Sequence, residues 1–273
     1  MNKKIFSFVT IAALGLSGCG APAQDDVITI GLNGSDSVVW ESVADTLADE
    51  GINIELKYFS DYILPNDALA NGDIDLNAFQ TVAFFEKTLS EKPDYDLVPI
   101  CTTVRAPMGI YSEQHSTLDE VADGAKVSIP NDESNRARSL ILLQSAGLIT
   151  LPADYDASNL APADIIDNPY NLEIIELEST QIARSIADVD YAVINNGVAV
   201  DAGYVPVEDA VFVEPETSTD YINIIAAPAS EKDNETYKEI CDVYQTDENA
   251  ELIIEDSNGS SIPTFVELSD IGW

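Results

Sequence analysis

The chain has 273 residues, of which 49 are acidic and only 12 are lysine or arginine, so its formal net charge is −37 at pH 7. A surface this negative repels phosphate backbones and anionic lipid headgroups, so nucleic acid and acidic membrane surfaces are poor partners. Hydrophobic residues make up 45% of the chain, which is enough to fill a core and argues against disorder. The length suits one large or two small domains.

The first residues have the pattern of an export signal. Two lysines precede an apolar run, 5–16, which is too short to span a bilayer as a mature helix. The run ends in Leu-Ser-Gly-Cys, which resembles the bacterial lipobox, whose cysteine is acylated. We expect a lipoprotein signal peptide at 1–18, a lipid on Cys19 and a tether at 19–26. An ordinary secretory peptide with an incidental cysteine is the alternative.

Strand-like and helix-like patterns alternate along the rest of the chain, which predicts α/β layers with mainly parallel sheets. We expect a first lobe from 27–105 plus 222–273 and a second from 106–221, joined by two crossing segments. Strands are predicted at 27–32, 52–59, 74–76, 95–101, 108–111, 126–129, 172–177, 191–194, 210–213 and 221–226. Helices are predicted at 38–49, 65–71, 81–89, 134–146, 180–187, 231–244 and 248–255.

The helix that begins near Ser134 and ends at Gly147 carries Arg136 and Arg138 in its first turns. Positive charge is unfavourable there because of the helix dipole, yet two of the four arginines occupy this position. A bound anion would explain this, because free backbone N–H groups and a guanidinium together make a carboxylate site. The alternative is that both arginines pair with the abundant surface acids.

Asparagines recur beside apolar or aromatic runs near strand ends, at Asn77, Asn195 and Asn223. A partly buried amide needs hydrogen-bond partners, and each of these could serve only turns and backbone ends. Together with Arg138 they supply what a zwitterion needs, because a guanidinium meets the carboxylate and amide oxygens accept from the ammonium. Aromatic faces can cover the ligand side chain.

Catalytic motifs do not appear in the mature sequence. The only histidine, His115, lies in a polar loop, and there is no phosphate loop, HExxH, CxxC or GxSxG pattern. We therefore expect no enzyme, cofactor or metal site, although a carboxylate-only glycosidase is compatible with so many acids. Cys101 and Cys241 could form a disulfide in an exported protein or remain two buried thiols.

Six motifs follow one another in a recognisable order. They are FSDYILPNDALANGDIDLNAFQ (59–80), PMGIYS (107–112), PNDESNRARSLILLQSAGLI (130–149), YAVIN (191–195), YINII (221–225) and a terminal Gly-Trp. In this order they resemble the NlpA-type methionine-binding lipoproteins, the substrate-binding components of methionine ABC importers. The resemblance implies a periplasmic-binding-protein-like α/β fold with two lobes, a hinge and a ligand cleft.

Site residues follow from the same resemblance. Arg138 matches the arginine that grips the ligand carboxylate, and Asn135 matches the asparagine before it. Asn195 and Asn223 match amides that hold the polar end of the amino acid. Tyr62, Phe79 and Phe84 fall at positions that contribute to the apolar side-chain pocket. Asn77, from the asparagine pattern above, and Thr81 complete the expected site.

The pocket departs from the family pattern at three positions. Many members have histidine where this chain has Thr81, tyrosine at Phe84, and some have tyrosine at Ala106. The resemblance implies methionine, L or D, as the ligand, with another apolar amino acid, a methionyl dipeptide or another organic anion as the alternative. An extracellular carboxylate hydrolase is the less favoured alternative.

The resemblance also implies a place in the cell and partners. We expect a lipid-anchored protein on the extracytoplasmic face of the cell membrane. Acylated Cys19 would hold it in the bilayer, and it would deliver the ligand to an ABC permease and its ATPase subunit. No nucleic acid is expected among the partners.

Overall fold

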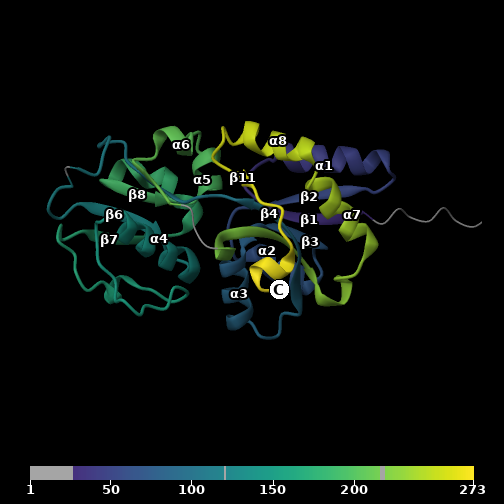
Figure 1. Cartoon of the computed structure of the whole chain (residues 1–273), viewed down its shortest axis with the longest axis horizontal. Helices are drawn as coiled ribbons and strands as arrows, with labels where there is room; N and C mark the ends of the chain where they lie inside the picture. Colours follow the sequence, from purple (N-terminus) through teal and green to yellow (C-terminus); the bar gives the residue numbers. More distant parts are fainter. Residues whose placement is uncertain (1–26, 120, 216–218) are drawn as a thin grey trace, which may run out of the picture.

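The computed structural model describes residues 27–119, 121–215 and 219–273, which form two α/β lobes side by side (Figure 1). The predicted signal peptide, the lipidated Cys19 and the tether lie outside these residues. Over the described ranges, no helix combines the length and apolar character needed to cross a membrane.

The first lobe contains a six-stranded sheet of order β11-β4-β10-β3-β1-β2. Strand β1 is parallel to β2 and β3, whereas β10 is antiparallel to β3 and β4, and β11 is antiparallel to β4. The strands are β1 (Ile28–Asn33), β2 (Ile54–Phe59), β3 (Leu76–Thr81), β4 (Leu97–Arg105), β10 (Ile222–Pro228) and β11 (Ile262–Pro263).

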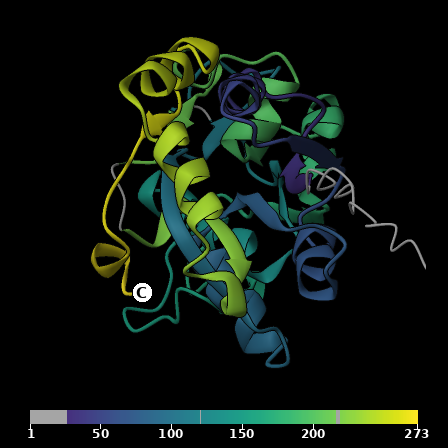
Figure 2. The ribbon, with the colours of Figure 1, turned by 90° about the vertical axis from the view of Figure 1, so that its right-hand side faces the viewer.

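Helices cover both faces of this sheet (Figures 1 and 2). The core on one face includes Trp40, Ile240 and Ile253, and the core on the other includes Leu69 and Phe85. The first face is covered by α1 (Val38–Asp49), α7 (Glu235–Tyr244) and α8 (Asp247–Asp256). The second is covered by α2 (Leu64–Asn71), α3 (Val82–Glu91) and the 3-10 helix η5 (Leu268–Ile271).

The second lobe contains a five-stranded sheet of order β7-β6-β8-β5-β9, in which β6 is parallel to β7 and β8, and β5 is antiparallel to β8 and β9. Helix α4 packs on one face, and the 3-10 helix η2 and α5 pack on the other. The strands are β5 (Gly109–Tyr111), β6 (Lys126–Pro130), β7 (Glu173–Leu177), β8 (Tyr191–Ile194) and β9 (Phe212–Val213). The helices are α4 (Glu133–Ser145), η1 (Pro162–Asp164), η2 (Ser179–Asp188), α5 (Asn196–Asp201) and α6 (Pro206–Asp209); η3 (Thr219–Tyr221) and η4 (Ala229–Glu231) follow β9 and β10.

The prediction of mainly parallel sheets is wrong, because the strands beside the crossings run antiparallel to their neighbours. Strands β5 and β10 both receive the chain directly from the other lobe. Each of them begins at the edge of its sheet where the parallel strands end, so it must run antiparallel to those strands. The segment 180–187, predicted as an α-helix, is also different: it lies within the 3-10 helix η2.

Cys101 of β4 and Cys241 of α7 form a disulfide, one of the two alternatives that the sequence left open. The bond closes a sequence separation of 140 residues. It ties a helix from the end of the chain to the strand that leads into the second lobe. The C-terminal part of the first lobe is thereby linked covalently to its N-terminal part.

Candidate functional site

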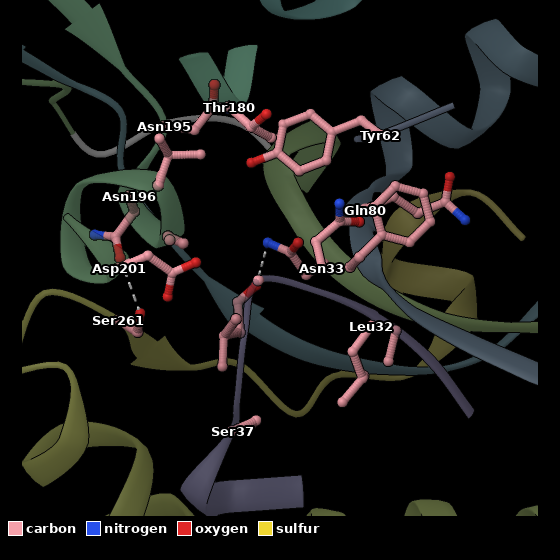
Figure 3. A pocket seen from close by; sticks show the side chains of 18 of the residues that line it. Leu32, Asn33, Ser37, Tyr62, Gln80, Thr180, Asn195, Asn196, Asp201 and Ser261 are labelled. Atoms are coloured by element: carbon pink, nitrogen blue, oxygen red, sulfur yellow. Dashed lines mark hydrogen bonds between the residues drawn. The ribbon is translucent and has the colours of Figure 1, made fainter. Parts of the chain in front are cut away.

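A cleft of about 600 Å³ is lined by residues of both lobes. It lies where parallel strands end, since β1 and β3 reach it at Asn33 and Thr81, and β8 ends one residue before Asn195. Ligands of α/β proteins bind outside the carboxyl ends of parallel strands, and the volume is that of a small-molecule site. Figure 3 shows side chains from both lobes, among them Tyr62 and Asn195, around one space.

The two lobes also contact each other directly around the cleft. Thr180 Oγ1 of the second lobe donates to Ser60 O of the first at 2.9 Å. Lys87 on α3 forms an ion pair with Glu133 on α4, with 2.5 Å between Nζ and Oε2. The lobes are therefore close enough for a ligand between them to contact both.

Arg138 lines the cleft from α4 and is only 4% exposed. Its Nε and Nη2 donate to the two carboxylate oxygens of Glu214, at 2.9 and 2.5 Å, and Nη2 also donates to Ala106 O at 3.1 Å. The guanidinium carbon lies 4.3 Å from the centre of the Tyr221 ring. Of the five N–H donors of arginine, the two on Nη1 have no hydrogen-bond partner among the described residues.

The two alternatives for the arginines of α4 thus have a mixed outcome. Arg136 pairs with the half-exposed Glu176 at 3.5 Å and donates to Leu160 O, as a structural arginine does. Arg138 also pairs with an acid, but Glu214 is buried and not on the surface. Both charges are therefore compensated, and only Arg138 faces the cleft.

A chain of hydrogen bonds sets the direction of the cleft amides. The Asp132 carboxylate caps α4 and accepts from Asn135 Nδ2 at 2.9 Å, which leaves Asn135 Oδ1 to accept from Asn195 Nδ2 at 2.8 Å. An ionised carboxylate only accepts, so it fixes which end of each amide faces the next. Asn195 Oδ1 is then left buried, without a hydrogen-bond partner among the described residues, as an acceptor at the edge of the cleft.

Burial shapes the acid–base properties of this chain. It raises the pKa of Asp132, although hydrogen bonds from Ser179 and from Asn135 act in the opposite direction. It also raises the pKa of Tyr62, with a further contribution from the nearby charge of Asp132. Burial raises the pKa of Tyr221 to about 12 even though the Arg138 guanidinium lowers it. The two tyrosines are therefore neutral; the Tyr62 ring lines the cleft, and the Tyr221 ring packs against the Arg138 guanidinium.

An aromatic wall stands in the first lobe and consists of Tyr62, Phe79 and Phe84. The ring centres are 5.9 to 6.2 Å apart, and the Phe84 ring stands edge-on to both others. All three rings line the cleft, as does Thr81, whose Oγ1 accepts from Phe84 N and caps α3. Such a wall suits an apolar ligand side chain.

Asn77, predicted as a binding residue, does not line the cleft. It is fully buried near the beginning of β3, where Nδ2 donates to Asn66 Oδ1 at 2.9 Å and Oδ1 accepts from Gln80 Nε2 at 2.8 Å. Asn77 lies toward the end of β3 away from the cleft, and its amide is used within this network. The amide network instead joins β3 to the start of α2, and Gln80 is the member of it that lines the cleft.

The cleft also contains the other predicted residue, Asn223, whose Nδ2 donates to Val104 O at 3.2 Å. Sequence reasoning missed several lining residues, including Asn33, Gln80 and Asp201, and the buried partner Glu214. Asn33 follows a predicted strand and could have been found by the rule of carboxyl ends. Among so many acids, neither Asp201 nor Glu214 carries a signal in the sequence.

Among the described residues, no group of three or more histidine, cysteine, aspartate or glutamate side chains is arranged to hold a metal ion. The cleft instead combines neutral amides, aromatic rings and the compensated, buried Arg138, with Arg184 and three aspartates also among its lining residues. Two α/β lobes around such a cleft define a solute-binding protein of the two-lobe type. This is the class that the sequence predicted.

Comparison with known proteins agrees. The family model for the NlpA lipoprotein matches residues 28–265. A D-methionine-binding lipoprotein MetQ of Salmonella typhi is 40% identical over 272 residues, which covers 94% of this chain and 98% of the relative. A nutrient-binding protein from Burkholderia cenocepacia, solved bound to methionine, is 38% identical, with a TM-score of 0.84 over 87% of this chain and all of that one. Protein PG110 of Staphylococcus aureus is 42% identical, with a TM-score of 0.86 over 89% of this chain and 96% of that one.

The chain belongs to the NlpA lipoprotein family. The predicted family and the two-lobe α/β fold are thereby confirmed, and so is the expectation of a binding protein and not an enzyme. The residues that bind the ligand of this chain are still a prediction.

Proposed function

We propose that this protein binds methionine, L or D, between its lobes and delivers it to an ABC importer. The observation that supports this most is a hydrogen-bond donor and an acceptor in one cleft, neither of which has a partner in the part of the chain that the structure describes. Nη1 of the buried Arg138 can donate to a carboxylate, and the buried Asn195 Oδ1 can accept from an ammonium. These are the two charged groups that every amino acid carries.

The aromatic wall supports an apolar side chain on the ligand. Tyr62, Phe79 and Phe84 present ring faces and edges with no formal charge, and a thioether makes favourable contacts with aromatic rings. Similar proteins named for D-methionine binding, and one solved with methionine, favour this side chain over other apolar ones. Thr81 and Phe84, where the family pattern differs, are the positions at which another apolar amino acid or a methionyl dipeptide would be accommodated.

Delivery and location are part of the same proposal. The protein would be held by acylated Cys19 on the extracytoplasmic face of the cell membrane and would meet a permease with its ATPase subunit. The relatives carry the word lipoprotein in their names, which supports an anchored, exported protein. We further propose that 27–105 with 222–273 and 106–221 move as two units about the crossing segments.

A thermal-shift panel tests the ligand. Protein unfolded and refolded to remove any bound solute is mixed with L-methionine, D-methionine, leucine, alanine, methionyl dipeptides and simple carboxylates. A ligand at 100 times its Kd should add about 2.7 kcal/mol to the free energy of unfolding. We expect the largest shift with a methionine enantiomer; a larger shift with a dipeptide or a simple carboxylate would assign the cleft to that solute instead.

A further inference from the structure

Glu214 occupies a special place in the site although it does not line the cleft itself. Its two oxygens take Nε and Nη2 of Arg138, and Oε2 also accepts from Met108 N at 3.1 Å. Both side chains of the pair are 5% exposed. The pair is thus closed on itself, and Glu214 cancels the arginine charge before any ligand arrives.

Charge cancellation has a consequence for what the cleft accepts. The only other cation that lines it, within the part of the chain described, is Arg184, which is exposed and screened by water. The lining acids Asp36, Asp201 and Asp256 add negative charge. A ligand with a carboxylate but no ammonium would thus bring an uncompensated negative charge next to Glu214. A zwitterion would add no net charge to the site.

Hydrogen-bond geometry limits the arginine in the same direction. With Nε and Nη2 fully used, only Nη1 remains for the ligand, so the side-by-side, two-nitrogen grip that arginine gives to free anions is blocked. A ligand must then gain the rest of its binding free energy from a group other than its carboxylate. In a zwitterion this comes from the ammonium at Asn195 Oδ1.

We propose that Glu214 is a specificity-determining residue that makes the cleft select zwitterionic amino acids against anions of the same shape. This inference rests on the proposed binding of an amino-acid carboxylate at Arg138. Glu214 acts through Arg138: it takes two of the five N–H donors of the guanidinium and cancels its charge. It does not touch the ligand.

The test compares two probes, L-methionine and its des-amino analogue 4-(methylthio)butanoate, by calorimetry on the wild-type protein and on Glu214→Gln. In wild type we expect methionine to bind far more tightly. In Glu214→Gln we expect the ratio of the two affinities to fall about ten-fold or more, because removing a like charge from a buried site favours the anion. A merely structural loss, such as a displaced Arg138, would weaken both probes equally and leave the ratio unchanged, which would overturn the proposal.

Two further variants complete the test. Glu214→Asp keeps the charge, so the ratio should stay within about three-fold of wild type even where both affinities drop; a collapse of the ratio in Glu214→Asp would overturn the proposal even if Glu214→Gln does not fold. Glu176→Gln, the same change beside Arg136, should leave both affinities unchanged. If wild type binds neither probe, the proposed function fails and not merely the role of Glu214.

Discussion

Arg138 and Glu214 form a buried ion pair at the point where both connections between the lobes meet. Ala106, whose carbonyl accepts from Arg138, lies in the first connection, and Glu214 directly follows β9 at the start of the second. Tyr221, under the guanidinium, lies at the end of the second connection. The group that we propose to hold the ligand carboxylate is therefore bonded to the segments about which the lobes would move.

Arg138→Ala should weaken methionine binding by about 2–5 kcal/mol, because it removes the partner of a buried carboxylate. It should also lower the free energy of unfolding by roughly 3–5 kcal/mol, since Glu214 is left buried and unpaired. Calorimetry and urea denaturation measure the two effects. Arg136→Ala, on the same helix but outside the cleft, is the matched control and should change methionine affinity little. Equal affinities in Arg138→Ala and wild type would rule out the carboxylate role.

Replacing both members of the pair separates stability from binding. The double variant Arg138→Leu, Glu214→Leu leaves no unpaired charge, so its free energy of unfolding should lie within about 1 kcal/mol of wild type or above it. Methionine binding should still be lost. A double variant as unstable as Arg138→Ala would mean that the ion pair is needed for folding in a way that charge pairing does not explain.

The disulfide should matter for stability and not for recognition. Cys101→Ala with Cys241→Ala should lower the free energy of unfolding by roughly 2–5 kcal/mol, because the bond closes a very long loop. Neither cysteine lines the cleft, so methionine affinity below the melting transition should change less than about two-fold. Urea denaturation with and without reductant, followed by calorimetry, tests both parts. An unchanged unfolding free energy would contradict the first.

The raised pKa of Asp132 predicts a pH dependence of stability. The folded protein holds the Asp132 proton more tightly than the unfolded chain does, in which the pKa of this group is near 3.8. The contribution of the group is therefore full below that value and is lost as pH rises through the raised folded-state pKa. Asn caps helices as well as Asp does, and it does not titrate. The free energy of unfolding of Asp132→Asn, relative to that of wild type, should therefore increase as the pH rises from 3 to 7. Urea denaturation at both pH values checks this; a difference that does not vary with pH would contradict it.

The aromatic wall should act on the ligand side chain only. Phe79→Ala should weaken methionine binding by about 1.5–3 kcal/mol, the value of burying a large apolar side chain. Alanine carries the same charged groups, but its side chain is too short to cover the rings. The substitution should therefore weaken the binding of alanine much less. Competition calorimetry of the two amino acids gives the ratio. An equal loss for both would show that Phe79 supports the polar end of the site.

Sequence patterns indicated the helix that carries Arg138 and the amide Asn195, because each stands at a strand or helix end with a clear signal, whereas the three rings were expected only from the family resemblance. The patterns could not identify Glu214, which lies 76 positions from Arg138 and is one of 49 acids. Asn77 was wrongly placed because the strand predicted at 74–76 would put it at a carboxyl end, whereas β3 runs from Leu76 to Thr81 and puts it near the beginning. The Ile224–Gln80 and Ala226–Asn77 pairs also reveal an irregular register, so alternation along this strand does not determine its faces.

The prediction of mainly parallel sheets was also wrong. Local patterns give strands and helices, but antiparallel pairing of β5 and β10 depends on where the chain returns from the other lobe. The same applies to the disulfide, whose two cysteines meet only after the last helices pack on the first sheet. These features arise from long-range packing.

The central claim is that the cleft binds methionine through its amino and carboxyl groups. Titration calorimetry of L- and D-methionine into refolded, ligand-free protein tests it most directly. The account predicts saturable binding of one methionine per chain for at least one enantiomer, and loss of that binding in Arg138→Ala. No binding of either enantiomer to the folded wild-type protein would contradict it.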